Sequence, residues 1–394
     1  MLEPGLVPDL VPDLVPDLAP VLVAAGGTGG HLFPAEALAV ALTKRGMTVH
    51  LATDRRAARY GGAFAEQSIH VVASATLAAR NPIAFTRTAA MLGLGLIQAL
   101  ALLGRLKPAA VIGFGGYPTI PPVLAAVWRG VPSLIHDANA VIGRANRLLA
   151  PRVTAIATTF PDVFSRAPDL AAKTTLTGNP VRPAVVAAAA TPYPALGPAP
   201  GPALGPAFGD ILRLLIFGGS QGARIMADIV PAAIGLLEPA LRARLAIIQQ
   251  AREEDLGRVR GAYASLAVAA EIAPFFPDLP ARMAASHLIV SRSGASTVAE
   301  LAAIGRPAIL VPLPHALDQD QFANAGVLEK AGGAILLVQA SFTPQRLAAE
   351  IGALAAAPQN LAAMAVAAKS VGRLDAADRL ADLVLKVAGI ASKQ

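Results

Sequence analysis

The feature that most constrains the fold is a regular alternation of short apolar runs and longer amphipathic segments, beginning at Val21. In the first half, segments with helical spacing, such as Pro34–Arg45, separate the apolar runs. Parallel strands need helical crossovers, so this order predicts a parallel sheet covered by helices. The candidate strands are Val21–Ala25, Thr48–Thr53, His70–Ala73, Ala110–Ile112, Ser133–His136, Thr154–Ala157 and Thr174–Leu176.

The alternation stops over residues 187–209, where Ala, Pro and Gly dominate as in a semi-rigid linker, and then restarts. We therefore expect two doubly wound α/β domains, over 21–180 and 210–376, with ligands bound in the cleft between them. Proline recurs through residues 1–20 and indicates a low-complexity tail, or a short partner-binding segment. The later candidate strands are Leu212–Phe217, Leu245–Gln249, Val268–Ala273, Leu288–Val290, Ala308–Val311 and Ile335–Val338.

Composition excludes several classes of protein. The chain has 394 residues, 54% of them apolar, which is incompatible with general disorder. It has no Cys, which excludes disulfides, thiol nucleophiles and Cys-ligated metals. The net charge of +7 suits phosphorylated substrates or anionic lipid. Nucleic acid is disfavoured, because basic residues form no block and do not interleave with aromatics.

Membrane and secretion signals are weak. The longest apolar run, Ala89 to Gly104, is shorter than the roughly 20 residues that span a bilayer. The N-terminus has no basic region before an apolar stretch, so we expect a cytoplasmic protein.

Three glycine-rich loops follow candidate strands, where backbone N–H groups can approach an anion at a helix N-terminus. A single loop of this kind can be purely steric, but three together favour a phosphate ligand. Neither the dinucleotide fingerprint nor the P-loop spacing fits, which leaves a nucleotide or sugar nucleotide held by backbone amides. The loops are Gly26–His31, Gly113–Tyr117 and Gly218–Arg224.

Seven stretches in order carry a specific resemblance to the MurG family of glycosyltransferases. These hexosyltransferases add GlcNAc from UDP-GlcNAc to lipid I (undecaprenyl-pyrophosphoryl-MurNAc-pentapeptide) in peptidoglycan synthesis, a process linked to cell shape and division. The stretches are GGTGGHLFPA from Gly26, GFGGYP from Gly113, HDANAVIGRAN from His136, TGNPVR from Thr177, FGGSQGAR from Phe217, SRSGASTVAEL from Ser291 and PLPHALDQDQFANA from Pro312.

The resemblance implies a GT-B fold, with the acceptor on the N-terminal domain and UDP-GlcNAc on the C-terminal one. It implies inversion at the anomeric carbon by direct attack of the muramyl 4-hydroxyl, with UDP leaving. It also implies that the last helix, over residues 377–388, crosses back to the first domain.

His31 is the candidate catalytic base under this resemblance. The positive end of the helix that it opens favours neutral imidazole, which can accept a proton. A His that merely caps or packs at the turn is the alternative. The resemblance places Thr28, Gly29 and Gly30 near the sugar and the acceptor pyrophosphate.

The donor side depends on Glu300 and Arg182. By resemblance Glu300 binds the ribose hydroxyls, although Thr297 and Glu300 also have the spacing of a capping box. Arg182 matches an arginine near the donor and can pair with phosphate, with a surface salt bridge as the alternative. Gln321 and Asn324 could also be an ordinary polar helix start. The remaining expected contacts are Asn139, Ser220, Gln221, Phe276 (through its backbone), Ala295, Ser296, Thr297, Gln321 and Asn324.

Three departures from the family pattern bear on affinity more than on reaction type. Asp137-Ala138 replaces the usual Glu-Gln, Asp320 adds a negative charge before Gln321, and the segment Gln249–Arg252 matches only partly. Asp318 and Asp320 have metal-motif spacing but fall in the expected sugar-binding turn. We expect no required cofactor and no obligatory protein-bound metal, although a divalent cation could assist UDP departure.

The expected partners are UDP-GlcNAc, lipid I, an anionic membrane surface and other cell-wall synthesis proteins, at the cytoplasmic face of the inner membrane. Apolar residues Leu92–Leu103, flanked by Arg80, Arg87, Arg105 and Lys107, suit reversible membrane binding. A buried helix of the first domain is the alternative. Two other functions stay open: a transferase with another lipid acceptor, such as diacylglycerol, and a non-catalytic nucleotide-sugar or membrane-associated binding protein.

Overall fold

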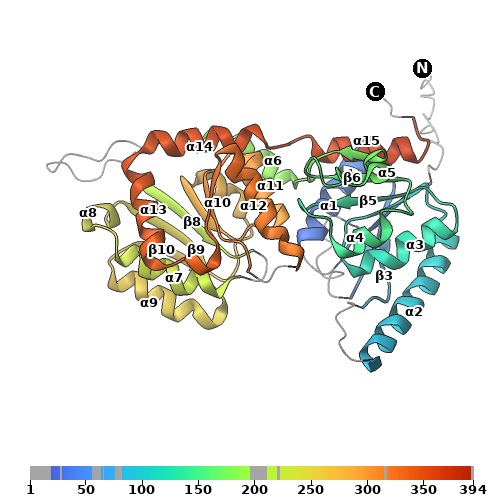
Figure 1. The fold of residues 1–394 in the computed structure, drawn as a ribbon, viewed down its shortest axis with the longest axis horizontal. Helices are drawn as coiled ribbons and strands as arrows, with labels where there is room; N and C mark the ends of the chain where they lie inside the picture. The colour runs from blue at the N-terminus through green and yellow to red at the C-terminus, as the bar shows by residue number, and fades with distance from the viewer. Residues whose placement is uncertain are drawn as a thin grey trace, which may run out of the picture.

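The structure is a computed structural model that describes residues 19–26, 29–55, 64, 66–75, 82–195, 211–219, 222–314 and 317–391. It shows two domains side by side, each built on a parallel sheet (Figure 1). Several of the predictions fall outside the described residues: the tail up to residue 18, Arg80, and the site residues Thr28, Ser220 and Gln221.

The N-terminal domain has a seven-stranded sheet in the order β3-β2-β1-β4-β5-β6-β7, with every pair parallel. Because β1 lies between β2 and β4, the chain reverses direction across the sheet there, which is where such folds bind ligands. The strands are β1 (Val21–Ala24), β2 (Val49–Thr53), β3 (Ile69–Val71), β4 (Ala110–Gly113), β5 (Ser133–Asp137), β6 (Ala155–Thr158) and β7 (Thr174–Leu176). The helices are α1 (Gly29–Thr43), α2 (Pro82–Leu106), α3 (Ile120–Trp128), α4 (Arg144–Leu149) and α5 (Pro168–Ala171).

The C-terminal domain has a six-stranded parallel sheet in the equivalent order β10-β9-β8-β11-β12-β13. Alternate residues of its central strand enter two cores, Leu214 and Ile216 on one face and Leu215 and Phe217 on the other. The strands are β8 (Leu212–Phe217), β9 (Leu245–Gln250), β10 (Ala269–Ala273), β11 (Leu288–Ser291), β12 (Ala308–Leu310) and β13 (Ala334–Leu336). The helices are α6 (Pro183–Ala189), α7 (Arg224–Gly235), α8 (Pro239–Arg242), α9 (Leu256–Ser265), α10 (Leu279–Ala285), α11 (Ala295–Ile304), α12 (Asp320–Ala331), α13 (Pro344–Ala356) and α14 (Pro358–Ser370).

The predicted fold class is confirmed: all strands expected from the sequence are present, with ends displaced by two residues at most. The linker differs from expectation at its start. Residues 187–189 are the last turn of α6, which packs on α10 and α11 of the C-terminal domain. Beyond α6, the buried Arg306 guanidinium donates to the carbonyls of Thr191 and Pro192, which fixes this part of the chain to the same domain.

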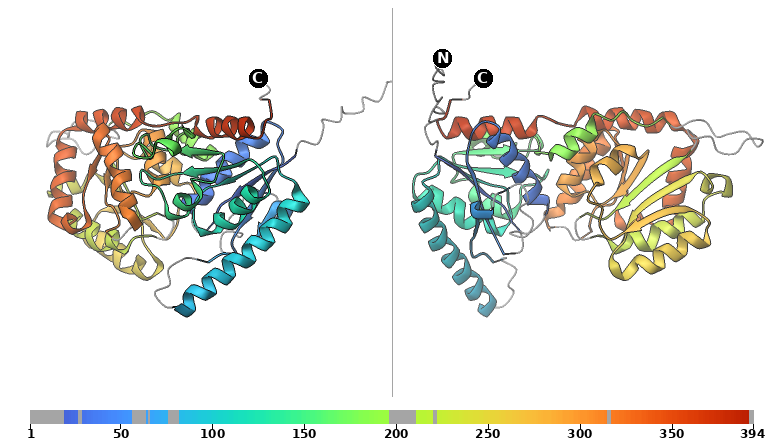
Figure 2. Two further views of the ribbon diagram at one scale, coloured as in Figure 1. Left: turned by 45° about the vertical axis from the view of Figure 1, so that its right-hand side comes forward. Right: turned by 180° about the vertical axis from the view of Figure 1, so that it is seen from behind.

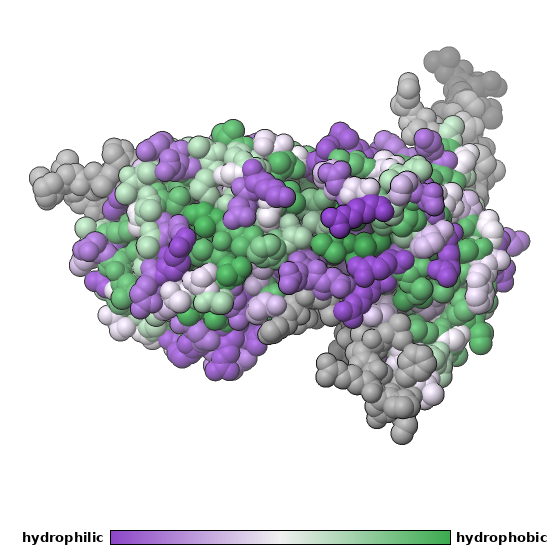
Figure 3. All heavy atoms as spheres, in the orientation of Figure 1, coloured by the Kyte–Doolittle hydropathy of each residue, from purple (hydrophilic) through white to green (hydrophobic). Residues whose placement is uncertain are grey.

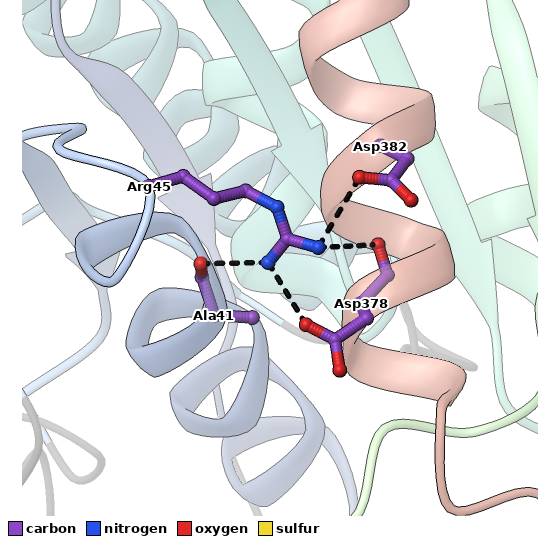
Figure 4. Close-up of polar contacts among 4 residues, drawn as sticks. All are labelled: Ala41, Arg45, Asp378 and Asp382. Carbon is purple, nitrogen blue, oxygen red and sulfur yellow. Dashed lines mark hydrogen bonds and ion pairs between the residues drawn. The ribbon is translucent and has the colours of Figure 1, made fainter. Parts of the chain in front are cut away.

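The last helix, α15 (Ala376–Val387), follows the C-terminal domain in sequence but lies against α1 of the N-terminal domain (Figures 1 and 2). Leu380 and Val384 are fully buried in the N-terminal core, which accounts for most of the stability of this contact. Arg45 adds a clasp by donating to the Asp378 carboxylate at 2.9 Å and the Asp382 carboxylate at 3.2 Å (Figure 4).

Helix α2 runs along the outer side of the N-terminal domain (Figure 2). By length and composition, its part from Thr86 to Leu106 could cross a membrane. An 18-residue stretch of this part has a mean hydropathy of 1.7, and 22% of that stretch is buried. Of the described helices it alone passes this test, unless α13 and α14, bent by 98°, count as one span. The apolar helix is thus longer than the run Ala89–Gly104 that the sequence suggested.

One side of α2 packs against α3, and the other faces outward. A Cβ atom at Gly95 would clash with the carbonyl oxygen of Ala73, so glycine is needed where this helix meets the domain. On the outer side Leu94 is 47% exposed and Ile97 is 67% exposed. Figure 3 shows apolar surface where α2 lies, at lower right. The alternative of a wholly buried helix is therefore wrong for this segment.

Candidate active site

A cavity of about 170 Å³ lies between the domains at the carboxyl ends of β1, β4 and β5. His31 lines it from the start of α1, Gly115 and Gly116 from the loop after β4, and Asp137 and Asn139 from the end of β5 and the loop after it. Asp318 and Asp320 line it from the C-terminal domain. A second hollow lies between α7 and α9 and contains none of the predicted site residues.

His31 is the third residue of α1, and its ring packs directly on two glycines. A Cβ atom on Gly115 or Gly116 would lie 3.3 Å from the imidazole, and both glycines have positive φ angles, +88° and +77°. Burial lowers the pKa of His31, and the backbone of Phe114 opposes this only in part. The ring is therefore neutral at pH 7 and can accept a proton. Burial, rather than the helix end invoked from sequence, is the largest cause.

The loop after β5 is shaped by Asp137, a residue that departs from the usual family pattern. Its carboxylate accepts the backbone N–H groups of Asn139 at 3.0 Å and Gly143 at 2.9 Å, and the Asn146 side chain at 3.1 Å. Burial nevertheless raises the pKa of Asp137 to about 6, because these hydrogen bonds compensate desolvation only partly. A buried carboxyl group thus fixes the wall of the cavity opposite Asp318.

Beside it, His136 is fully buried, and its Nε2 lies 3.0 Å from the carbonyl oxygen of Gly178, to which it can donate. Burial lowers the pKa of His136 to about 4, so this ring is also neutral at pH 7. His136 ties β5 to the segment that leads from the N-terminal domain to Arg182.

Two of the predicted sugar-binding residues contact each other across the cleft. Buried Asn324, on α12, donates to the Asn139 side-chain oxygen at 3.0 Å and accepts the backbone N–H of Ala140 at 2.8 Å. These interdomain bonds argue against an ordinary polar helix start for Asn324. Gln321 lies one turn earlier, and its side-chain oxygen accepts the backbone N–H of Leu313 at 3.1 Å.

Glu300 and Arg182, predicted separately, form an ion pair at 3.2 Å. Glu300 is 6% exposed, and burial raises its pKa while Arg182 opposes the rise. The capping-box alternative is wrong, because α11 begins after Gly294 and no side chain caps it. Nor is the pair a surface salt bridge, since the Arg182 side chain is 25% exposed and its guanidinium carbon lies 4.1 Å from the centre of the Phe33 ring.

The start of α11 meets the first glycine loop. Ser296 Oγ donates to the carbonyl oxygen of Gly30 at 3.3 Å, which brings Ala295–Thr297 next to the helix that carries His31. Gly29, the residue before Gly30, packs on Phe33 one turn along α1, since a Cβ atom there would press on the Phe33 ring. The uncapped N–H groups of α11 and its dipole favour an anion at this position.

At the carboxyl ends of β8, β9 and β10 in the C-terminal domain, Gln250 joins two loops. Its side-chain oxygen accepts the backbone N–H of Gly218 at 2.9 Å, and its side-chain nitrogen donates to the carbonyl oxygen of Pro274 at 3.0 Å. The second loop carries Phe276, whose ring is buried with the Arg282 guanidinium carbon 4.5 Å from its centre. This role of Gln250 was not predicted from the sequence, although its position at the end of β9 is a usable signal.

No three His, Asp or Glu side chains converge in the geometry of a metal site in the part of the chain that the structure describes. Asp318 instead lies 3.4 Å from Arg144 across the cleft, and its backbone has a left-handed φ of 58°. The absence of an obligatory metal stays a prediction.

Comparison with known proteins gives a consistent result. The glycosyltransferase family 28 N-terminal domain matches residues 21–158, and the family 28 C-terminal domain matches residues 213–380. A UDP-N-acetylglucosamine–N-acetylmuramyl-(pentapeptide) pyrophosphoryl-undecaprenol N-acetylglucosamine transferase of Rhodopseudomonas palustris (strain HaA2) is 66% identical over 370 residues, covering 94% of this chain and 98% of the relative. The enzyme of the same name from Nitrobacter winogradskyi is 62% identical over 368 residues, covering 93% and 97%.

Among solved structures, Acinetobacter baumannii MurG is similar with a TM-score of 0.72 and 28% identity, covering 93% of this chain and 99% of that one. The part of the chain that the structure describes thus has the two-domain GT-B architecture of that protein. On the two domain matches and on relatives above 60% identity over nearly the full length, the chain belongs to glycosyltransferase family 28, in its MurG family of N-acetylglucosamine transferases.

Proposed function

We propose that this enzyme transfers GlcNAc from UDP-GlcNAc to the 4-hydroxyl of MurNAc in lipid I, giving lipid II. The observation that carries the proposal is the cavity between the domains, where neutral His31 faces residues of both halves. The printed names of the relatives support the substrates: UDP-N-acetylglucosamine as donor, and an N-acetylmuramyl-(pentapeptide) pyrophosphoryl-undecaprenol as acceptor.

In the proposed reaction the muramyl 4-oxygen attacks the anomeric carbon of GlcNAc from the face opposite the diphosphate. The bond from this oxygen to the carbon forms while the bond to the diphosphate oxygen breaks, so the configuration inverts. A ring nitrogen of His31 takes the hydroxyl proton, and UDP leaves with the bonding electron pair. Burial favours this step because it keeps His31 unprotonated near neutral pH.

The C-terminal domain holds the donor in this proposal. The uncapped start of α11, over Ala295–Thr297, binds the diphosphate, and Glu300 accepts hydrogen bonds from the ribose hydroxyls. Arg182 pairs with the negatively charged diphosphate of the bound donor. Asn139, Gln321 and Asn324 contact the sugar, and the backbone at Phe276 binds the uracil. Thr28, Gly29, Gly30, Ser220 and Gln221 complete the set by resemblance.

The proposal is tested by transfer of radiolabelled GlcNAc from UDP-GlcNAc to a short-chain lipid I analogue. We expect labelled disaccharide product from the purified chain. Binding of UDP-GlcNAc without any labelling of the lipid would contradict the acceptor assignment. Diacylglycerol, tested in parallel, checks the alternative transferase, and no turnover with any acceptor would favour a binding protein.

We further propose that no protein-bound metal is required. Glu300 and Arg182 already supply the polar partners that the ribose and the diphosphate need. Full activity in EDTA would support this, and complete loss that magnesium restores would contradict it.

We also propose that the enzyme works peripherally at the cytoplasmic face of the inner membrane, with α2 against the anionic surface. The exposed apolar residues Leu94 and Ile97, with Arg87 and Arg105 at the two ends of the helix, support this. Ile97→Glu should reduce binding to vesicles of phosphatidylglycerol and phosphatidylethanolamine several-fold. The matched control is Val366→Glu on α14, where an equally exposed apolar residue lies on the other domain. Equal loss in both variants would contradict the proposal.

A further inference from the structure

We propose that Phe33 is a positioning residue, which holds the Arg182 guanidinium where the donor diphosphate binds. The inference rests on the proposed function, since it assigns a role at the donor site. Phe33 lies on α1, two residues after His31, whereas Arg182 immediately precedes α6. A side chain of the acceptor domain thus sets the position of a donor-binding group.

The Arg182 side chain has three relations that together define its position. Its guanidinium carbon lies 4.1 Å above the centre of the Phe33 ring. One terminal nitrogen pairs with the buried Glu300 carboxylate at 3.2 Å. Its Nε is buried and has no hydrogen-bond partner. The guanidinium therefore has one face on an aromatic ring, one edge on a carboxylate, and a donor left to satisfy.

The unpartnered Nε–H belongs to the Arg182 cation, so it favours an anionic oxygen as ligand. A charge-assisted hydrogen bond would satisfy the donor and neutralise the positive charge. The uncapped start of α11 adds further N–H donors on the helix that carries Glu300. A diphosphate is the ligand chemistry that suits both groups. Glu300 neutralises Arg182 when no donor is bound. When the donor binds, its diphosphate becomes the partner of Arg182 and its ribose hydroxyls become the partners of Glu300.

During this exchange Arg182 loses its ion pair, and the contact with Phe33 is what remains to keep its long side chain in place. A cation over an aromatic face is attracted by the quadrupole of the ring, and the stacked guanidinium stays planar with its N–H edges free for phosphate. An aliphatic side chain of similar size would fill the space without this attraction. The ring itself, rather than its volume, should therefore matter.

The test is the affinity for UDP, measured by calorimetry on the full chain. Phe33→Leu should weaken UDP binding about three- to tenfold, the range of a cation–π contact. Phe33→Tyr and Phe33→Trp should bind within about twofold of the parent, because they keep an aromatic face. In an Arg182→Met background, Phe33→Leu should have no further effect. With UDP-GlcNAc in the transfer assay, Phe33→Leu should raise KM for the donor and leave kcat nearly unchanged.

A matched control is Phe164→Leu, a buried phenylalanine of the same domain core. It should lower the melting temperature at least as much as Phe33→Leu while leaving UDP affinity unchanged. Equal losses in Phe33→Leu and Phe33→Tyr, or a Phe33→Leu effect that persists without Arg182, would overturn the inference. A parent chain that binds no UDP would instead overturn the donor assignment itself, and with it this role of Phe33.

Discussion

The two domains share the same order of strands but line the cleft with different polar groups. The N-terminal wall carries buried groups that titrate abnormally, with the pKa of His31 lowered and that of Asp137 raised to about 6. The C-terminal wall carries side chains that are already paired: Gln250 with two loops, Asn324 with Asn139, and Glu300, whose pKa burial raises, with Arg182. The shared strand order therefore leaves function to the loops after the strands.

This difference separates two tasks. A group that takes a proton must be held unprotonated near neutral pH, and burial in the N-terminal wall provides that for His31. Groups that bind a donor need fixed hydrogen-bonding geometry, which pairing in the C-terminal wall provides. We therefore expect substitutions on the N-terminal wall to lower kcat, and those on the C-terminal wall to raise KM for the donor.

The largest effect should come from the N-terminal wall. His31→Ala removes the proposed base, so kcat should fall by about 10²-fold or more while KM for UDP-GlcNAc changes little. Steady-state transfer assays with varied donor concentration would measure both constants. Unchanged kcat would assign His31 to positioning and remove the chemical distinction between the walls.

The second prediction asks whether an abnormal pKa alone marks the site. His287 lies in the C-terminal domain away from the cleft, yet burial lowers its pKa to about 4 from 6.5. The unfolded chain binds the extra proton between these pH values, so stability present above pH 6.5 is lost as the pH falls through this window. The loss is at most about 3 kcal/mol at pH 4.

His287 Nδ1 accepts the backbone N–H of Arg213 at 2.9 Å, and an asparagine oxygen can take that place. His287→Asn should therefore unfold with a flatter pH dependence between pH 4 and 6.5 and keep normal transfer activity at pH 8. Denaturant unfolding at several pH values measures the slope. A slope identical to that of the parent would show that this histidine is not the group that titrates.

The third prediction concerns the donor wall. Glu300→Ala should raise KM for UDP-GlcNAc about tenfold, because the ribose hydroxyls lose a charged acceptor, and it should change kcat by less than about threefold. Glu329→Ala, an exposed carboxylate on α12, serves as the control and should leave both constants alone. A fall in kcat with constant KM would place Glu300 in the chemical step.

The smallest effect, on thermal stability, is expected from the exposed ion pairs between α15 and the N-terminal domain. Arg45→Ala removes the pairs with Asp378 and Asp382, whose side chains are 61% and 58% exposed. Such exposed pairs contribute about 1 kcal/mol or less, so the melting temperature should fall by only a few degrees. A loss of several kcal/mol would mean that the clasp, rather than the buried face of α15, holds this helix.

The sequence predicted the fold well because apolar periodicity is a local property. Every strand of both sheets was found this way, from Val21–Ala24 to Ala334–Leu336. The extent of α2 was underestimated, because an apolar run stops at the first polar residues whereas a helix continues through them. The start of the linker was misplaced because its alanines extend α6.

Many contacts of the candidate site could not be predicted from the sequence, because they join residues that are far apart in it. Arg182 and Glu300 were each predicted from a motif, but nothing local indicates that they pair with each other or that Phe33 stacks on the arginine. Likewise the role of Asp137 depends on backbone N–H groups that converge only once the loop has folded. The motifs identified which residues belong to the site, whereas the burial of those residues and their hydrogen-bond partners became known only from the fold.

The most direct test of the proposed chemistry is the pH dependence of single-turnover transfer, with saturating UDP-GlcNAc and a lipid I analogue. The account predicts that the rate rises with pH as one group loses its proton, with the midpoint of the rise below pH 6.5, since burial lowers the pKa of His31 from that value. His31→Gln should be slow and should lack this rise. A rise centred above pH 6.5, or one that persists in His31→Gln, would contradict the account.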